Sequence, residues 1–520
     1  MFKKKVIVTA SVAAIIACQP LFAIAGAAPD GKTLAQFTSA AANGKYDAWE
    51  TEWSSISKDW TQVSLTPGSD ETKINFAWYS KSGSNEALSY GTSPNLDSST
   101  TVTHTQTKAQ EGYVSNKATI TLLEPNTTYY YRVGNREINS FKTQNTSSFS
   151  FVFVGDPQIG SSNAMKAKKP EDIAVPEFAT AQYEAVESDT FNWNNTLEMA
   201  IKQSKEMPSF ILSAGDQIQT NAKKVDDISI SEIEYAGYLS PDILESLPVA
   251  TTVGNHDSDN PNYTWHFNTP NLSTLGSNNI VGGDYYFRHG KALFIMLNTQ
   301  DTNSAEHKKF IEETVKANKD CKWKIVTLHQ DIYGSAEHSN EPEITNLRYE
   351  LVPIFEANDI DVVLTGHDHA YSRSYILKGG VKTTEYTDDE FDSQLEKDLE
   401  NGESKATLTV GPMNILYTTT DADEITYLTY LREVMDKKAV VSTENTVVNP
   451  DGILYMTAGS SSGSKYYDLS PRKQTYVANR WQEDIPTYSL VEIDNDSFTI
   501  NTYRTDTNEK IDTEMSIIKK

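Results

Sequence analysis

The chain has 520 residues, which allows about two to four domains, and 38% of them are hydrophobic, which is enough for apolar cores. Lysine and arginine together number 45, against 71 aspartates and glutamates, and the formal net charge is therefore −26. So acidic a surface repels the phosphates of nucleic acids and anionic membranes, and we expect neither as a partner, although a bound metal could still create a local cationic site.

Residues 1–28 have the features of a secretory signal peptide, namely three lysines, a long apolar run and then small residues. Two interpretations remain open. The triplet Ala23-Ile24-Ala25 suits ordinary signal cleavage, whereas the residues before Cys18 suit a lipid anchor on that cysteine. We favour plain secretion because the apolar segment resumes beyond Cys18. The expected location is extracytoplasmic, either secreted or at the cell surface.

The rest of the chain predicts neither a transmembrane span nor a disulfide. No later run approaches the roughly 20 apolar residues that a membrane span needs. After signal removal, Cys321 is the one cysteine left unless Cys18 is retained with a lipid, and no intramolecular disulfide can then form.

Residues 29–59 contain alanine, serine and tryptophan at helical spacing, and we predict a short helical lead-in there. From residue 60 the pattern changes to alternating apolar and polar residues separated by clusters of Gly, Ser, Asn and Pro, which indicates β-strands. The stretch 123–134, LEPNTTYYYRVG, resembles the tyrosine-corner strand of fibronectin type III domains, in which a tyrosine bonds back to upstream backbone. We therefore predict a fibronectin III-like β-sandwich over 60–145, with a loose β-meander as the alternative.

Residues 146–520 show a different pattern, in which short apolar runs without alternation predict strands that are buried on both faces. These runs cover 149–155, 210–215, 249–254, 292–297, 323–328, 360–366 and 453–459. Helix-like segments lie between several of them, at 192–206, 306–319 and 344–358, and 489–503 is typical of a closing hairpin. The pattern predicts a layered α/β domain of sheets flanked by helices. An acidic, polar stretch inside 376–450 indicates a surface insertion.

Residue types that bind metal ions follow almost every one of these runs. They are Asp156, Asp216, Asn255 with His256 and Asp257, His329, and the pair His367 and His369. Because sites in open α/β sheets form past the carboxyl ends of the strands, we expect these side chains to converge on one edge. Carboxylate, amide and imidazole ligands together suit Zn²⁺, Mn²⁺ or iron.

Each motif alone also has an ordinary explanation. A strand followed by Gly-Asp is often a turn or a helix cap, Asn255 can cap its own turn, and His329 can be a hydrogen-bonded core histidine. The pair His367 and His369 is a stronger signal, because alternate residues on an extended backbone face the same way. The joint order, with a metal-binding type after each strand, is what favours a metal site.

The order Gly-Asp-x-Gln, Gly-Asp, Gly-Asn-His-Asp, strand-His and Gly-His-x-His resembles that of the calcineurin-like metallophosphoesterases. The stretch 366–374, GHDHAYSRS, and a β-sandwich ahead of the α/β domain are similar to the purple acid phosphatase branch of that superfamily. The resemblance covers residues 60–375 and 450–515 and leaves the insertion 376–450 outside. The separation between Asp156 and Asp216 is longer than that family leads us to expect.

This resemblance implies two metal ions and the hydrolysis of phosphate esters. Asp216 would bridge the metals, Asp156 and His369 would hold the first, and Asn255, His329 and His367 would hold the second. A metal-bridging hydroxide would attack phosphorus, and the metal pair would stabilise the attacking and leaving oxygens. The expected function is cleavage of small phosphomonoesters. The alternatives are a phosphodiesterase or nucleotidase on the same site, or a non-catalytic surface binding protein with a degenerate metal site.

Four further residues are candidates around the metals. His256 would bind a phosphate oxygen or protonate the leaving group, and Asp257 would orient His256 or cap its own loop. His338 resembles a second active-site histidine of purple acid phosphatases. Arg373 is a candidate phosphate contact, although we favour a structural ion pair for it.

Two glutamines depart from the family pattern. Gln219 stands where purple acid phosphatases have a metal-binding tyrosine, so the tyrosinate-to-iron colour is not expected and selection for ferric iron weakens. Gln158 stands where many metallophosphoesterases have a histidine, and its amide could bind metal weakly or hold a metal-bound water. The metals would therefore be Fe, Zn or Mn, with Ca also compatible.

Overall fold

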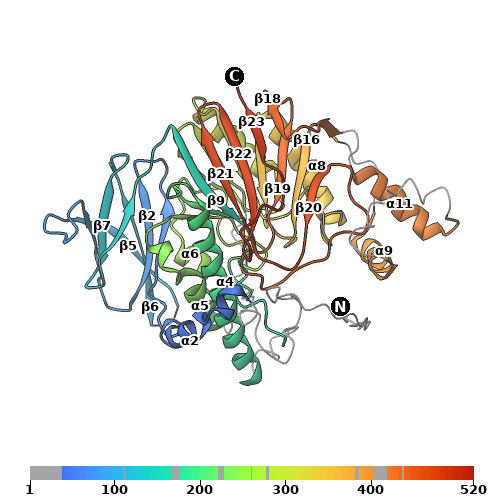
Figure 1. The fold of residues 1–520 in the computed structure, drawn as a ribbon. Helices are drawn as coiled ribbons and strands as arrows, with labels where there is room; N and C mark the ends of the chain where they lie inside the picture. The colour runs from blue at the N-terminus through green and yellow to red at the C-terminus, as the bar shows by residue number, and fades with distance from the viewer. Residues whose placement is uncertain are drawn as a thin grey trace.

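A computed structural model describes residues 38–520, apart from 111, 166–175, 221–227, 259–260, 277–279, 381–385, 402–418 and 436–438. The predicted signal peptide and Cys18 lie outside the described residues. Figure 1 shows a β-sandwich at one end, two sheets with their helices in the centre, and the helices of the insertion at the other end. No helix in the described part of the chain is long and apolar enough to cross a membrane.

The lead-in forms the helices α1 (Ser39–Ala42) and α2 (Lys45–Ile56). Tyr46, Trp49 and Trp53 lie three and four residues apart and make one buried face of α2. That face packs against α4 (Pro176–Gln203), where the Trp49 indole N–H donates to the Glu187 carbonyl at 2.8 Å. Helix is confirmed for the described part of the predicted lead-in, whose residues 29–37 lie outside the described residues. It joins the core of the α/β domain rather than that of the sandwich.

Two four-stranded sheets confirm the predicted β-sandwich. One has the order β1-β2-β6-β5 and the other β4-β3-β7-β8. The strands are β1 (Val63–Pro67), β2 (Ile74–Lys81), β3 (Leu88–Gly91), β4 (Thr100–Val102), β5 (His104–Lys108), β6 (Tyr113–Ile120), β7 (Thr128–Val133) and β8 (Asn139–Lys142). Phe76 and Tyr131 meet edge to face between the sheets at 4.9 Å. The predicted tyrosine corner is present, because the Glu124 backbone N–H donates to the Tyr129 hydroxyl at 2.8 Å.

The α/β domain is built on two sheets. The first has the order β11-β10-β9-β21-β22-β23-β18, and the second has β12-β13-β14-β15-β19-β16-β17, with β20 paired to β16. The strands of the first are β9 (Ser148–Val154), β10 (Ile211–Ser213), β11 (Val249–Thr251), β18 (Thr446–Val448), β21 (Thr487–Asp494), β22 (Ser497–Arg504) and β23 (Met515–Ile518). Those of the second are β12 (Tyr285–His289), β13 (Ala292–Met296), β14 (Trp323–Thr327), β15 (Val362–Thr365), β16 (Tyr371–Leu377), β17 (Val440–Ser442), β19 (Ile453–Thr457) and β20 (Val477–Trp481).

The two sheets face each other across an aromatic core. Phe151 of β9 meets Phe294 of β13 edge to face at 5.4 Å, and both are fully buried. The alternate residues of β9, such as Val152, point instead into the helical layer outside the first sheet. This double burial explains the apolar runs without alternation. The predicted strands are confirmed, but the expectation that they share one sheet edge is wrong, because they divide between two facing sheets.

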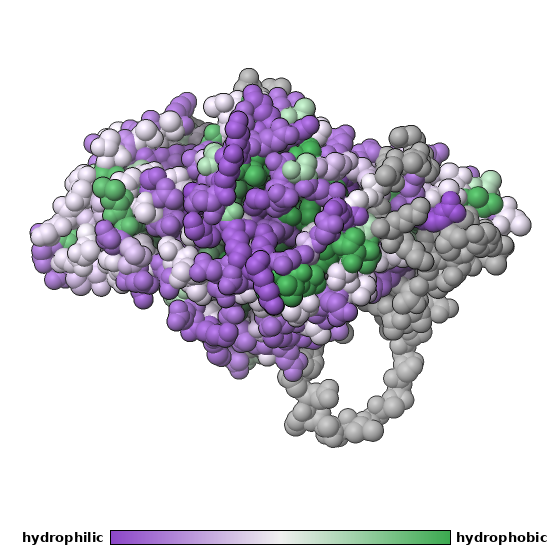
Figure 2. Space-filling model, turned by 90° about the horizontal axis from the view of Figure 1, so that it is seen from above, coloured by the Kyte–Doolittle hydropathy of each residue, from purple (hydrophilic) through white to green (hydrophobic). Residues whose placement is uncertain are grey.

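Helices cover the outer face of each sheet, which gives four layers. The helices α4 and α5 (Ile228–Leu239) lie on the first sheet, while α7 (Ser304–Ala317) and α8 (Pro342–Ala357) lie on the second. Two short helices, η4 (Asp242–Glu245) and α6 (Asn262–His266), lie on the side of the sandwich. The face seen in Figure 2 is mostly hydrophilic with small hydrophobic patches, as the net charge of −26 leads us to expect.

The insertion has a small core of its own between α9 (Asp388–Asn401) and α11 (Ala422–Val434). It is fixed to α8 through the Tyr430 hydroxyl, which lies 2.8 Å from the Thr345 hydroxyl. Its last part differs from the prediction, because β17 pairs with β16 and β18 pairs with β23. The insertion predicted over 376–450 therefore ends before β17, where the chain returns to both sheets.

Candidate metal centre

The six predicted metal ligands come together at the carboxyl ends of strands from both sheets. Asp156 and Asp216 follow β9 and β10, Asn255 follows β11, His329 follows β14, and His367 and His369 follow β15. Ligand atoms of Asp156, Asp216 and His329 all lie within 4.8 Å of one another, and all three residues are buried. The paired sheets thus deliver side chains that are far apart in the sequence to one place.

His329 lies at the centre of the cluster. Its Nε2 is 3.4 Å from Asp216 Oδ2, 3.1 Å from Asn255 Oδ1 and 3.2 Å from His367 Nδ1. On the other side, His369 Nε2 is 3.7 Å from Asp156 Oδ1. Asp156 Oδ1 is also 3.9 Å from His329 Nδ1, so the six side chains form one cluster, and the division into the two ligand sets that the resemblance implied stays a prediction.

Hydrogen bonds to backbone carbonyls orient two of the imidazoles. His329 Nδ1 donates to the Ala214 carbonyl at 2.8 Å, and His369 Nδ1 donates to the Lys465 carbonyl at 2.8 Å. Each bond fixes the tautomer that leaves Nε2 with a lone pair facing the carboxylates. Metal-binding histidines are commonly held in this way.

The donor set fits a metal pair. With Nδ1 committed to Ala214, neutral His329 presents a lone pair at Nε2, and His367 Nδ1 faces that atom at 3.2 Å. The carboxylates of Asp156 and Asp216 converge on the same point, where a metal cation could accept several of these lone pairs at once. The residues present therefore suit hard or borderline metal ions with oxygen and nitrogen ligands.

Five residues of the centre have left-handed backbone, and this corrects the expectation of an extended His367-x-His369 segment. The φ angles are 47° for Asp156, 36° for Gln158, 50° for Asp216, 73° for His367 and 52° for His369. Asp and His are among the few residue types that tolerate this region. The bend after β15 is stabilised by the His367 backbone N–H, which donates to Asp156 at 3.0 Å. Strain of this kind is concentrated at functional sites.

Two glycines make room for the carboxylates. A Cβ on Gly254 would lie 2.0 Å from Asp216 Oδ1, and one on Gly366 would lie 2.6 Å from Asp156 Oδ2. The glycine of each Gly-ligand motif is thus required by close approach rather than by a turn alone.

Burial and mutual charge shift the ionisation of the centre. Burial and the neighbouring Asp216 charge raise the pKa of Asp156 to about 8. Burial also disfavours the Asp216 anion, but the charges of His329 and His256 outweigh it and lower its pKa. Burial lowers the pKa of His329, yet the Asp216 charge outweighs this effect and raises it to about 9. Bound cations would replace the protons that the raised pKa values imply on Asp156 and His329, because metal ligands must be deprotonated.

The two glutamines have buried side-chain atoms without a hydrogen-bond partner among the described residues. Gln158 is fully buried, and within the described residues neither its Oε1 nor its Nε2 has a hydrogen-bond partner. The same holds for Oε1 of Gln219, whose backbone carbonyl accepts a bond from His256 Nδ1 at 2.6 Å. Unsatisfied buried amides are costly, so each glutamine is available to a ligand or a metal-held water.

The structure decides between the alternatives for Asp257. Its carboxylate accepts bonds from the backbone N–H groups of Gly254 at 2.9 Å and Gln217 at 3.2 Å, which makes it a cap for two loops. The ring of His256 is instead oriented by Gln219, and its backbone N–H donates to Asp216 at 2.9 Å.

His338 lies beside the centre. Its ring is 5.0 Å from that of His367, and its Nδ1 donates to Asp368 at 3.1 Å. Arg373 does not reach the centre, which corrects its assignment as a substrate contact. It is buried in an ion pair with Asp512, with Nη2 at 3.1 Å from Oδ1, and it also contacts Asn445.

A buried network that the sequence motifs did not predict lies behind His338. Ser339 Oγ contacts carboxylate oxygens of both Asp331, at 2.9 Å, and Asp368. One hydroxyl proton cannot serve two acceptors, so one carboxyl must itself donate. Burial and the Asp368 charge raise the pKa of Asp331 far above its usual range, which identifies Asp331 as the neutral member. The acid between the two histidines of GHDH was the available signal.

A second missed feature is the loop after β19. Its serines bond to the Asp156 loop, with Ser460 Oγ donating to the Asp156 carbonyl at 3.1 Å. Tyr467 from the same loop packs edge-on against His338 at 4.3 Å and His369 at 5.2 Å. The Gly- and Ser-rich stretch GSSSGSK, directly after a predicted strand, was the signal for this loop.

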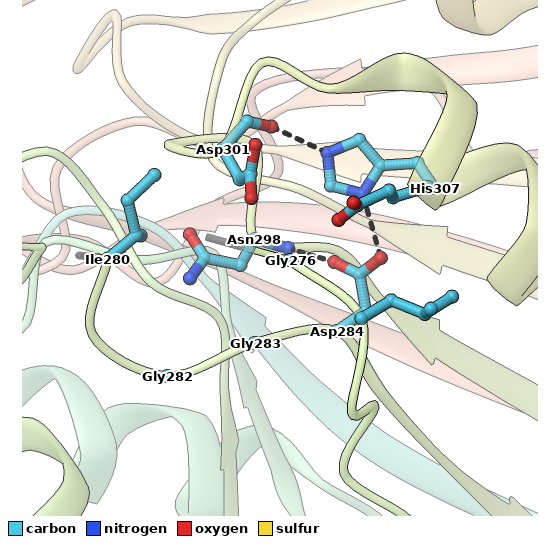
Figure 3. Close-up of a pocket in the computed structure, with 10 residues that line it drawn as sticks. Gly276, Ile280, Gly282, Gly283, Asp284, Asn298, Asp301 and His307 are labelled. Atoms are coloured by element: carbon cyan, nitrogen blue, oxygen red, sulfur yellow. Dashed lines mark hydrogen bonds and ion pairs between the residues drawn. The ribbon is translucent and has the colours of Figure 1, made fainter. Parts of the chain in front are cut away.

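A cavity beside the Asn255 loop contains none of the predicted ligands. Its wall includes Asp284, whose oxygens accept bonds from His307 Nδ1 at 2.7 Å and from the Asn298 backbone N–H at 2.8 Å (Figure 3). His307 Nε2 also donates to the Asp301 carbonyl at 2.7 Å. Both oxygens of Asp284 and both nitrogens of His307 are thus used in joining α7 to the preceding loops.

Two family models match adjoining parts of the chain. Residues 149–371 match the calcineurin-like phosphoesterases, and residues 60–152 match the N-terminal domain of purple acid phosphatases. The first match contains all six of the predicted metal ligands.

Several proteins are similar to the chain over part of its length. A phosphoenolpyruvate phosphatase of Allium cepa is 25% identical over 60% of this chain and 63% of its own length. Purple acid phosphatase 1 of Ipomoea batatas is 26% identical over 60% of this chain and 64% of its own. An uncharacterized protein of Mycobacterium tuberculosis is 26% identical over 26% of this chain and 30% of its own. The chain thus spans less than two thirds of the length of these relatives.

A solved structure has the same fold. The purple acid phosphatase PPD1 from seeds of yellow lupin (Lupinus luteus) matches 89% of this chain and 74% of its own, with a TM-score of 0.58 and 13% identity. The two family matches thus identify residues 149–371 as a calcineurin-like phosphoesterase domain, with the N-terminal domain of purple acid phosphatases ahead of it at residues 60–152.

Proposed function

We propose that this protein hydrolyses small phosphomonoesters with two metal ions held between the ends of the paired sheets. The observation that carries the proposal is the convergence of six ligand-type side chains, with His329 at their centre and with His329 and His369 each held in one tautomer by a carbonyl. The phosphoenolpyruvate phosphatase of Allium cepa supports the substrate class, since its name describes an enzyme that acts on a phosphomonoester.

In this proposal Asp156 and His369 would hold one metal, Asn255, His329 and His367 would hold the other, and Asp216 would be a ligand shared by both. When bound, such metals supply Lewis-acid stabilisation of phosphoryl oxygens and a nucleophile derived from water. The protein itself orients the imidazoles through carbonyls and buries the carboxylates, so that little reorganisation is needed when substrate binds.

We assign His256 to the phosphate or the leaving group. Its Nδ1 is committed to the Gln219 carbonyl, so Nε2 is the atom left to act toward substrate. Burial lowers the pKa of His256, and an arriving phosphate dianion would raise it again and favour the protonated form that can donate.

The two glutamines lead us to propose Zn²⁺ or Mn²⁺ rather than the ferric iron of a coloured enzyme. Neither amide offers the phenolate or imidazole that would select a ferric ion. Protein purified with added iron, zinc and manganese should then contain close to two metals per chain and show no tyrosinate-to-iron absorption. We also propose that the protein acts outside the cytoplasm, on the basis of its N-terminal segment.

Asp216→Asn and Asn255→Ala test the centre. Removing an outer partner of a metal site already costs about 10–100-fold, so we expect each variant to retain less than about 1% of wild-type turnover of 4-nitrophenyl phosphate. Metal per chain, measured by mass spectrometry of the elements, should fall in parallel.

Asp512→Asn is the matched control, since Asp512 is a buried carboxylate paired with Arg373 and should leave turnover unchanged. Full turnover by Asp216→Asn would refute the site. Turnover of the diester bis(4-nitrophenyl) phosphate should also be measured beside that of the monoester. Faster turnover of the diester would overturn the phosphomonoester assignment.

A further inference from the structure

Asp368, the residue between the two histidines of GHDH, makes contacts that a metal centre does not need. We propose that Asp368 is a positioning residue that holds the imidazole of His338 in one orientation beside the metal centre. What His338 then does for substrate rests on the function proposed above, whereas its orientation by Asp368 does not.

Four contacts of the Asp368 carboxylate go to the short segment 336–339, and a further one goes to the Asp331 carboxyl. Oδ1 accepts from the His338 ring Nδ1 at 3.1 Å and from the His338 backbone N–H at 3.0 Å. Oδ2 accepts from the Ala336 backbone N–H at 2.8 Å and from the Ser339 hydroxyl. The carboxylate is fully buried, so these donors replace its water completely.

Asp368 is itself fixed by the metal centre. The residues on either side of it are His367 and His369, and the His367 backbone N–H donates to Asp156 at 3.0 Å. The bend that directs the His367 ring toward His329 and the His369 ring toward Asp156 therefore also directs Asp368 toward His338. One turn of the chain thus orients the two predicted metal ligands and, through Asp368, also the imidazole of His338.

The ring of His338 is held from several sides. It lies 5.0 Å from the His367 ring and 4.3 Å from the Tyr467 ring, and its Nε2 is 4.0 Å from Glu341 Oε1, too far for a hydrogen bond. With Nδ1 bonded to Asp368, the free Nε2 is the atom that can reach a substrate oxygen or a water. A carboxylate behind an imidazole fixes both its tautomer and its direction.

Nitrogen NMR of histidine-labelled protein with added zinc tests the orientation directly. At a pH where the imidazole is neutral, we expect His338 as the Nδ1–H tautomer, with His338→Gln identifying its signals. Asp368→Asn should move these signals, while Asp512→Asn, a matched change at another buried carboxylate, should not. An Nε2–H tautomer in the wild type would overturn the proposal, whether or not Asp368→Asn folds.

A double-mutant cycle tests whether Asp368 acts through His338. We expect Asp368→Asn to lower kcat/KM for 4-nitrophenyl phosphate by about 10–100-fold with metal content unchanged. In the His338→Ala background the same change should cost less than about 2-fold, because its target has gone. Equal losses in both backgrounds, or loss of metal, would show that Asp368 only supports the bend. A wild type without turnover would refute the proposed function and leave the NMR result standing.

Discussion

Gly254 shows how a single missing side chain determines the centre. The sequence marks it only as the glycine before Asn255, and the structure shows that Asp216 occupies the space of its absent Cβ. The same relation holds for Gly366 and Asp156. Such close approach cannot be predicted from a motif, because it depends on which strand lies alongside.

Gly254→Ala should displace Asp216, since the new Cβ would lie 2.0 Å from Oδ1 and 2.4 Å from the backbone nitrogen. We expect metal affinity to fall by about 10–100-fold, as for other disturbed ligand supports, measured by titration with a zinc indicator. Gly283→Ala is the control, because its Cβ would find Leu272 at an ordinary 3.4 Å. Unchanged affinity in Gly254→Ala would contradict the steric account.

His256→Ala separates two roles for this imidazole. If His256 protonates the leaving group, kcat should fall by about 10²–10⁴-fold for alkyl phosphates and much less for aryl phosphates, which leave without a proton. If it only binds phosphate, the loss should be equal across leaving groups. A plot of log kcat against leaving-group pKa distinguishes them, and an unchanged slope would exclude the acid role.

At the scale of elements, α4 and α5 enclose a carboxyl group outside the metal centre. Glu234 of α5 is fully buried and accepts bonds from Gln182 Nε2 at 2.6 Å and the Thr220 backbone N–H at 2.8 Å. Burial outweighs these bonds and raises its pKa to about 8. The folded state therefore keeps the proton while the unfolded chain releases it above its ordinary pKa of 4.5.

Between pH 4.5 and 8 this difference should reduce the free energy of unfolding as pH rises, by at most about 1.4 kcal/mol per pH unit. Glu234→Gln removes the dependence, so urea unfolding should show it gaining stability relative to wild type from pH 5 to pH 8. Glu492→Gln, at a surface ion pair, is the control, and it should change the free energy of unfolding by the same amount at pH 5 and at pH 8. Parallel pH profiles of Glu234→Gln and wild type would contradict the raised pKa.

The elements themselves were predictable where burial imposes a pattern on the sequence. The strands β9, β13, β14, β15 and β19 are buried on both faces. Each was predicted as a strand from its short run of apolar residues. The strands β17 and β18 were not, since they are short, largely exposed and paired with distant strands. Nothing local in their residues requires either pairing.

At the scale of the whole molecule, the sandwich is bonded to the α/β domain beside α6. Asn268 Nδ2 donates to the Ala118 carbonyl at 3.0 Å and the Phe76 carbonyl at 3.3 Å, and its own carbonyl accepts from Asn75 Nδ2 at 2.7 Å. Nearby, buried Glu232 bonds to the Tyr79 hydroxyl of the sandwich at 2.8 Å. Polar residues in a closed interface fix one docking geometry, because each must find its partner.

Asn268→Ala should lower the free energy of unfolding by about 1–3 kcal/mol, because two strand carbonyls lose a donor. Turnover should change by less than twofold, since no metal ligand is touched. Calorimetry is the measurement, and we expect the sandwich transition to move to lower temperature ahead of the α/β domain. Asn194→Ala on α4 serves as a control, and an unshifted transition in Asn268→Ala would show that these bonds do not hold the domains together.

The sequence by itself determined the order of the ligands and the strands that deliver them, because residue type and apolar pattern are local properties. It also determined the tyrosine corner, which closes over five residues. The tertiary structure decided that the strands divide between two facing sheets, that His367 and His369 lie on a left-handed bend, and that Asp368 points at His338. These features depend on which distant segments meet in the folded chain, and no local pattern of residues encodes such a meeting.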